Sequence, residues 1–210
     1  MLFRSVDDDV SVRESLELLI RSAGWCPETF ASAGAFLSRP RADGPNCLLL
    51  DVSLPDLNGL ELQRRIAGDR RDLPIIFITG HADVPMTVQA MKAGAVEVLT
   101  KPLSDDILLS AVADAIEQSR ATLGRDAELR VIRDRYESLS TRERQVMALV
   151  VSGLLNKQIG AELQISEITV KAHRGKAMRK MKASSLAELV KMATTLRIPA
   201  PLTERVPTTP

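Results

Sequence analysis

Short apolar runs that alternate with segments of helical period constrain this chain more than any other feature of its sequence. The runs at 47–50 and 75–78 are apolar at every position, as strands are when both faces of a parallel sheet are covered. Between such runs, apolar residues recur at spacings of three and four, which indicates helices that cover the sheet. We expect five strands: Leu2–Val6, Cys26–Phe30, Cys47–Asp51, Pro74–Thr79 and Val96–Leu99. The pattern predicts an α/β doubly wound fold with a five-stranded parallel sheet.

Charge divides the chain into two halves. Residues 1–118 hold 11 basic and 18 acidic side chains, a net charge of −7, and the other 17 basic and 9 acidic side chains give +8. The basic half therefore suits contact with a polyanion.

The longest clean apolar run, Val146–Val151, is far shorter than the roughly 18 residues of a membrane span, so we expect a soluble, cytoplasmic protein without membrane contact. Cys26 and Cys47 lie among apolar residues without metal-ligand spacing, and we interpret both as buried.

Acidic, hydroxyl and basic side chains stand where the first, third, fourth and fifth strands end: Asp7, Asp8, Asp9, Asp51, Thr79 and Lys101. Because the carboxyl ends of parallel strands meet at one edge of a sheet, we expect these groups at one rim. Three carboxylates close together repel one another and need a hard divalent cation, for which Mg²⁺ is the candidate. Lys101 and Thr79 would stabilise phosphoryl oxygens, which makes Asp51 the candidate nucleophile.

Four motifs at this rim together resemble the receiver domain of a two-component response regulator: Asp7-Asp8, Asp51 to Gly59, Thr79-Gly80-His81 and Lys101-Pro102. The resemblance covers roughly residues 1–120, so we expect a receiver domain of residues 1–118, and it is closest to the FixJ-like receivers of the NarL/FixJ family. It implies a flavodoxin-like sheet and a sensor histidine kinase that phosphorylates Asp51. Asp8, Asp51 and the Ser53 carbonyl would hold Mg²⁺, with Asp7 helping through water and Lys101 paired with the phosphoryl group. The row of three aspartates leaves open a shift of the acid pair toward Asp9.

The same resemblance implies how a receiver of this kind is switched. The Thr79 hydroxyl would move toward the phosphoryl group, and the surface from about Val84 to Gln118 would pair with a second copy, giving a homodimer on phosphorylation. The chain departs from the family at Val98, where an aromatic residue often takes part in the switch. It also departs at Arg4 and Ser5, which occupy positions in the first strand that usually are apolar.

A helical linker is predicted for residues 119–137, where charges alternate and apolar residues are few. Leu129, Ile132 and Tyr136 keep a spacing of three and four, so a short coiled-coil seam and a solvated helix are both open interpretations.

Capping residues divide the remainder into short helices. Ser140 and Glu143 form a capping box, Gly153 ends that helix, Asn156 is expected to cap the second helix, and Ser166 the third. The third helix, from Glu167 to about Lys182, is dense in positive charge, as a DNA recognition helix is. The sequence therefore predicts a small all-α helix-turn-helix domain.

The stretch Leu139–Arg197 resembles the LuxR-type DNA-binding domain, through the motifs Leu139–Arg144, Gly153, Asn156–Ile159 and Thr169–Arg174, so we expect a DNA-binding domain of residues 138–198. The resemblance implies two groups of contacts to double-stranded promoter DNA. Residues facing the major groove would be Lys171, Ala172, Gly175 and Lys176, and residues nearer the phosphates would be Asn156, Lys157, Thr169, His173 and Arg179. The last helix, near Ser185–Leu196, is a dimer contact in the family or a plain packing helix. We expect residues 199–210 to form a disordered tail.

These features predict a phosphorylation-regulated bacterial transcription factor that is not an enzyme, with RNA polymerase as a further candidate partner. A phosphatase with an aspartyl-phosphate intermediate would need a second aspartate two positions after the nucleophile, where this chain has Ser53. A DNA-binding protein that is not switched is the remaining alternative.

Overall fold

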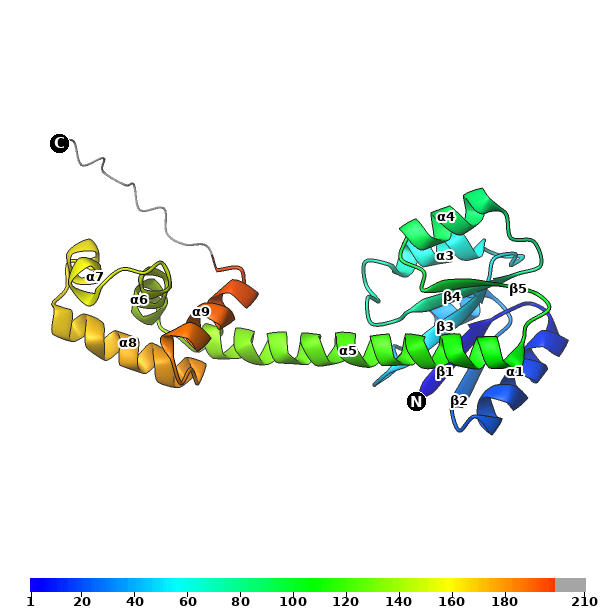
Figure 1. The fold of residues 1–210 in the computed structure, drawn as a ribbon, viewed down its shortest axis with the longest axis horizontal. Coiled ribbons are helices and arrows are strands. Elements are labelled where there is room, and N and C mark those ends of the chain that lie inside the picture. The colour runs from blue at the N-terminus through cyan, green and yellow to red at the C-terminus, as the bar shows by residue number, and fades with distance from the viewer. Residues whose placement is uncertain (199–210) are drawn as a thin grey trace. The chain divides into compact units, whose positions relative to one another are not determined.

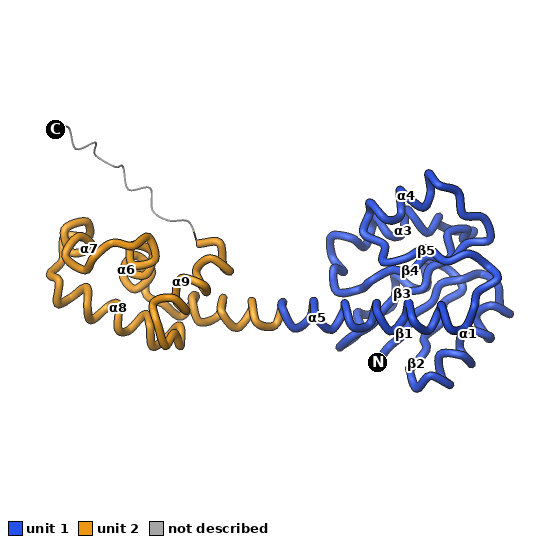
Figure 2. The backbone as a smooth tube through the Cα atoms, in the orientation of Figure 1, with its two compact units in different colours: residues 1–125 blue, residues 126–210 orange. Residues whose placement is uncertain are grey.

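The structure is a computed structural model that describes residues 1–198, so the tail predicted for 199–210 lies outside the described residues. Contacts divide the chain into two compact units, Met1–Arg125 and Asp126–Pro210 (Figure 2). Helix α5, Asp105–Glu137, contributes residues to both units. Over the described range, no helix combines the length and the apolar character that crossing a membrane requires.

The first unit contains a five-stranded sheet in the order β2-β1-β3-β4-β5, with every neighbouring pair parallel (Figure 1). Its strands are β1 (Leu2–Val6), β2 (Cys26–Phe30), β3 (Asn46–Asp51), β4 (Ile75–Thr79) and β5 (Glu97–Thr100). The helices between them are α1 (Val10–Ser22), α2 (Ala33–Leu37), α3 (Gly59–Ile66) and α4 (Val84–Lys92). The predicted doubly wound fold is confirmed, and strand order reverses between β1 and β3.

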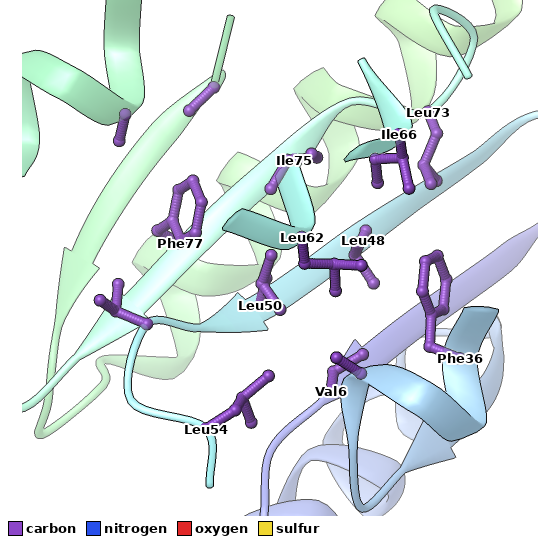
Figure 3. Packing of buried hydrophobic residues seen from close by; sticks show 14 residues of the cluster. Val6, Phe36, Leu48, Leu50, Leu54, Leu62, Ile66, Leu73, Ile75 and Phe77 are labelled. Carbon is purple, nitrogen blue, oxygen red and sulfur yellow. The ribbon is translucent and has the colours of Figure 1, made fainter. Parts of the chain in front are cut away.

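Two apolar layers cover the sheet because successive side chains of a strand point to opposite faces. On one face, Leu48 and Leu50 pack with Phe36 of α2 and Leu62 of α3, as Figure 3 shows. On the other face, the intervening residue Leu49 belongs to a cluster formed with α1 and α5. Both faces of β3 and β4 are therefore buried, which leaves the carboxyl ends of the strands for polar groups.

Both polar residues of β1, Arg4 and Ser5, are buried, but within residues 1–198 only the Arg4 side chain has hydrogen-bond partners. Arg4 donates from Nε to Glu28 Oε2 at 2.8 Å and from a terminal nitrogen to the Pro40 carbonyl at 3.0 Å. The buried Ser5 hydroxyl has no hydrogen-bond partner among the residues that the structure describes.

The prediction that both cysteines are buried is wrong for Cys26, which is exposed at the start of the edge strand β2; Cys47 is buried in β3.

The second unit contains α6 (Thr141–Val151), α7 (Asn156–Leu163), α8 (Glu167–Met181) and α9 (Leu186–Thr195). The capping box at the start of α6 is confirmed: Ser140 N donates to Glu143 Oε2 at 2.8 Å, and Glu143 N donates to Ser140 Oγ at 3.3 Å. Val146, Ile159 and Val170 form the centre of an apolar core to which α6, α7 and α8 each contribute.

The ends of the predicted linker pack into different cores. Ser119 is buried in the first unit, where its hydroxyl accepts from Asn46 N at 3.1 Å and donates to the Asp72 carbonyl at 2.6 Å. Ile132 and Tyr136 pack against the core of the second unit. Different side chains of α5 therefore contact the two units: Ser119 in the first, and Ile132 and Tyr136 in the second.

Candidate functional site

An acidic group forms where β1 and β3 end. One oxygen from each of Asp7, Asp8 and Asp51 lies within 4.8 Å of the others. Asp7 and Asp51 are buried, whereas Asp8 is exposed. The group therefore has two side chains fixed in the protein and one that faces solvent.

Lys101, which follows β5, bridges two of these carboxylates. Its Nζ lies 2.6 Å from Asp51 Oδ2 and 2.9 Å from Asp7 Oδ2. The other oxygen of Asp51 accepts a hydrogen bond from Ser53 N at 2.9 Å. Asp51 is thus held at both oxygens by groups from different strand ends.

Burial and charge oppose each other at this rim. Burial raises the pKa of Asp7 above its ordinary value, although the hydrogen bond from Lys101 acts in the opposite direction. Burial alone would lower the pKa of Lys101, but its hydrogen bonds to Asp51 and Asp7 outweigh that effect and raise it. Lys101 consequently remains a cation at neutral pH, between two carboxylates.

Asp9, the third aspartate of the row, has a different role. It caps α1, where its side chain accepts from Ser11 N at 2.8 Å and from Ser11 Oγ at 2.6 Å, and these bonds lower its pKa. Its own N–H donates to Asp7 Oδ1 at 2.9 Å and so helps to orient Asp7. Asp9 is therefore engaged with the start of α1, and the group of close carboxylates consists of Asp7, Asp8 and Asp51.

The hydroxyl of Thr79, at the end of β4, is engaged with the next loop. Thr79 Oγ1 donates to the His81 carbonyl at 3.0 Å and accepts from His81 N at 3.2 Å. The Thr79 carbonyl accepts from Lys101 N at 2.8 Å, which ties β5 to β4 beside the site. The rim thus brings Asp7, Asp8, Asp51 and Lys101 together, while the Thr79 side chain binds its own loop.

Gly59 supports the site through a close approach that the sequence reasoning did not identify. A Cβ at this position would lie 2.4 Å from the Asp51 carbonyl oxygen and 3.1 Å from Val52 Cα. Gly59 N also donates to the Val52 carbonyl at 3.0 Å. The glycine was visible as the last residue of a motif, but the sequence contains no signal for the distance between α3 and the backbone of Asp51.

The donor set fits a hard divalent cation. Three carboxylates and one ammonium leave a net charge of about −2 if all the acids ionise, and carboxylate oxygens are ligands that Mg²⁺ prefers. The exposed side chain of Asp8 leaves the group open to solvent, so water and phosphate oxygens have access to it.

In the second unit, α7 and α8 are joined by a tight turn. Gln164 adopts a left-handed conformation with φ of 55°, and a Cβ on Gly160 would lie 2.8 Å from the Ile165 carbonyl oxygen. Ser166 caps α8 by accepting from Thr169 N at 3.1 Å, as the sequence predicted. Close contact between helix and turn fixes the two helices as a helix-turn-helix.

The expectation that Asn156 caps α7 is wrong, because Asn156 is the first residue of the helix and Leu155 is the N-cap. Gln158 Oε1 satisfies the Leu155 N–H at 2.8 Å, and Asn156 Oδ1 accepts from Arg174 at 3.3 Å. The asparagine side chain therefore connects α7 to α8.

Most residues predicted to contact DNA are accessible. Asn156, Thr169 and His173 are half-buried; the exposed ones are Lys157, Lys171, Ala172, Gly175, Lys176 and Arg179. Lys171 Nζ lies 3.0 Å from Glu167 Oε1, one turn earlier on α8. Lys180, in the last turn of α8, donates from Nζ to Glu143 Oε2 at 2.7 Å and so ties the end of the helix to α6. Val170, Ala177 and Met181 are buried in the core of the second unit, so one face of α8 packs on that core and the other is open to solvent.

Comparison with known families agrees with the division of the chain into two units. Residues 4–113 match the family described as the response regulator receiver domain, and residues 137–193 match the bacterial regulatory proteins of the luxR family. The chain belongs to the two-component response regulators that join a receiver to a LuxR-type DNA-binding domain, the NarL/FixJ family. It is a transcription factor and not an enzyme, and its two domains imply a histidine kinase and DNA as partners.

Individual relatives match along nearly the whole chain. Nodulation protein W of Bradyrhizobium diazoefficiens is 48% identical over 200 residues, which are 95% of this chain and 88% of that protein. The transcriptional regulatory protein FixJ of the same species is 43% identical over 188 residues, 90% of this chain and 92% of that protein. The solved structure of the response regulator StyR is 43% identical, with a TM-score of 0.81 over 92% of this chain and 98% of that chain.

Proposed function

We propose that Asp51 accepts a phosphoryl group from a sensor histidine kinase, and that phosphorylation promotes homodimerisation and sequence-specific promoter binding. The observation that carries the proposal is the Asp51 carboxylate, held 2.6 Å from Lys101 Nζ and beside Asp7 and Asp8. An Asp51 oxygen forms a bond to phosphorus as the bond between phosphorus and the kinase imidazole breaks, and the imidazole leaves with the electron pair.

The residues of the rim have distinct roles in this transfer. Asp8, Asp51 and the Ser53 carbonyl would hold Mg²⁺, with Asp7 acting through water. When bound, Mg²⁺ would supply positive charge that stabilises the transferred phosphoryl group. Lys101 is already protonated and 2.6 Å from the acceptor, so its ammonium is positioned to pair with the same oxygens.

Thr79 connects the phosphoryl group to the rest of the receiver. Its hydroxyl would exchange the His81 carbonyl, now 3.0 Å away, for a phosphoryl oxygen, and the loop after β4 would lose that hydrogen bond. Val98 is half-buried and packs in the apolar layer that contains α4 residues, but its short side chain has little volume to move. The change must therefore reach α4 mainly through the loop that joins Thr79 to that helix.

Helix α4 offers a surface for a second copy. Val84, Val88 and Met91 are exposed and follow one another at spacings of four and three, so they line one side of the helix. They lie within the surface predicted to pair on phosphorylation, from about Val84 to Gln118, which supports a homodimer.

We propose a receiver of residues 1–118, a linker of 119–137 and a DNA-binding domain of 138–198. In the DNA-binding domain, α8 would enter the major groove. Base contacts are assigned to Lys171, Ala172, Gly175 and Lys176, and phosphate contacts to Asn156, Lys157, Thr169, His173 and Arg179. Gly175 supports this assignment, since a Cβ there would meet nothing within 4 Å in the described part of the chain. We expect promoter binding to take place in the cytoplasm, where the DNA-bound dimer would meet RNA polymerase.

Phosphorylation with acetyl phosphate and Mg²⁺ tests the proposal when mass, oligomeric size and DNA affinity are followed together. Wild type should gain one phosphoryl group and become dimeric, and Asp51→Asn should do neither. Asp56→Asn is a matched control, because Asp56 is an exposed neighbour that accepts from Ala33 N and Gly34 N at the start of α2. A wild type that takes up no phosphoryl group would indicate the unswitched DNA-binding protein instead.

A further inference from the structure

We propose that Ile168 reads thymine methyl groups in the major groove and thereby determines part of the sequence preference of this regulator. The inference rests on the DNA-binding function proposed above. Ile168 is the second residue of α8, and 79% of its surface is exposed, more than for any other large apolar side chain in the described range.

Helical period places Ile168 on the open face of α8. Ala172 follows after four residues and Gly175 after a further three, and both are exposed. The buried residues of the same helix, Val170 and Ala177, belong to the core cluster on its other side. Ile168 therefore lies on the face that carries the proposed base contacts.

The free protein provides no reason for isoleucine at this position. Burial in the core does not require it, because the side chain is exposed. Helix propensity does not favour it either, since a β-branched residue is less favourable than alanine in a helix. Its apolar surface is thus available to a ligand.

The surroundings of Ile168 favour DNA as that ligand. Lys171, Lys176 and Arg179 are exposed on the same helix, and their positive charge complements the negative charge of DNA. A protein partner would be expected to meet a larger apolar patch, whereas the residue before Ile168 is the exposed Glu167, which pairs with Lys171 at 3.0 Å.

Thymine is the base that Ile168 can recognise. An isoleucine side chain has no hydrogen-bond donor or acceptor, so it cannot read the polar groups of base edges. The C5-methyl of thymine is the apolar group that a base pair presents in the major groove. Contact between Ile168 and this methyl would favour thymine over the other bases.

Uracil substitution tests the contact directly, because uracil lacks the C5-methyl and keeps the polar groups of thymine. The full chain, phosphorylated with acetyl phosphate, first selects duplexes from a random library. Each thymine of the selected duplex is then replaced by uracil in turn. Wild type should lose about fourfold in affinity at one thymine of each half-site, the effect of one buried methyl group.

Ile168→Ser should bind the thymine and uracil duplexes equally at that position, and Ile168→Val should give an intermediate ratio. Leu155→Ser is the matched control, since Leu155 is 70% exposed in the same domain but precedes α7, and it should keep the wild-type ratio. Equal thermal midpoints for the variants would show that each is folded.

The outcomes separate this inference from the function on which it rests. A wild type that selects a duplex but tolerates uracil at every thymine would overturn the role of Ile168 and leave DNA binding intact. The same conclusion would follow if Ile168→Ser kept the wild-type ratio. A wild type that selects no duplex would overturn the proposed DNA binding itself, and the inference with it.

Discussion

Replacement of Gly175 by alanine should separate the stability of α8 from its contact with DNA. A Cβ at this position meets nothing within 4 Å across residues 1–198, so the added methyl causes no clash in the free protein. Alanine is more favourable than glycine in a helix by about 0.8–1.0 kcal/mol, which corresponds to roughly 4–8 °C in the midpoint of a small domain. Gly175→Ala should therefore raise the free energy of unfolding of the second unit.

The same methyl should weaken specific DNA binding, because it would lie between the helix backbone and the base edges. The loss expected is about 1–3 kcal/mol, as for a mismatched base pair, or about 5- to 150-fold in affinity. Fluorescence polarisation of a selected duplex measures this loss. NMR of the Tyr136 ring, the single tyrosine of the chain, measures unfolding of the unit into whose core it packs.

Gly124→Ala is the control, since Gly124 lies within α5, is exposed and has the same open space around its Cβ. It should gain helix stability without any change in DNA affinity. If Gly175→Ala bound the duplex as tightly as wild type, the assignment of Gly175 to the interface would be refuted. A lower free energy of unfolding would instead show that the added methyl clashes with its surroundings, contrary to the open space found around this position.

Three further predictions concern other parts of the chain. Gly59→Ala forces a methyl against the backbone of Asp51, the proposed phosphoacceptor, so the free energy of unfolding should fall by about 1–3 kcal/mol and phosphorylation by acetyl phosphate should slow. In a thiol-labelling assay, Cys26 should react in the native state, whereas Cys47, whose pKa burial raises to about 12, should react only after unfolding; a fast-reacting thiol in Cys26→Ser would contradict this. The hydrogen bond from Lys180 holds the pKa of Glu143 below its ordinary 4.5, so its contribution to stability is present above pH 4.5 and lost as pH falls through the lowered value. Urea unfolding across acidic pH should show this loss in wild type, and Glu143→Gln should lack that part of the pH dependence.

The sequence was sufficient to locate β3 and β4, because these central parallel strands contain continuous apolar runs that are buried on both faces. It failed where the environment of a residue depends on tertiary neighbours. Cys26 has apolar residues near it in the sequence, but β2 is an edge strand and leaves its first residue exposed. Asn156 is a favourable cap by residue type, yet Gln158 satisfies the N-cap N–H and Arg174 binds the asparagine.

The candidate site was predictable to a similar extent. The grouping of Asp7, Asp51 and Lys101 at one rim could be predicted, because the carboxyl ends of parallel strands meet at one edge of the sheet. The bridge that Lys101 makes between two carboxylates depends on side-chain conformation, and the engagement of Thr79 with His81 depends on the course of a loop. Neither the hydrophobic pattern nor the spacing of motifs contains that information.

The edges of the sheet determine how copies of the receiver can associate. Cys26 N donates to the Met1 carbonyl at 3.0 Å and the Phe30 carbonyl accepts from Asp7 N at 3.1 Å, so alternate residues of β2 face β1. Pro27 therefore faces outward, where an incoming strand would need an N–H that proline does not have. The other edge, β5, is four residues long. Because neither edge suits further strand pairing, copies of the receiver should meet through helix side chains, which allows a dimer to form and separate without the sheet growing into a fibre.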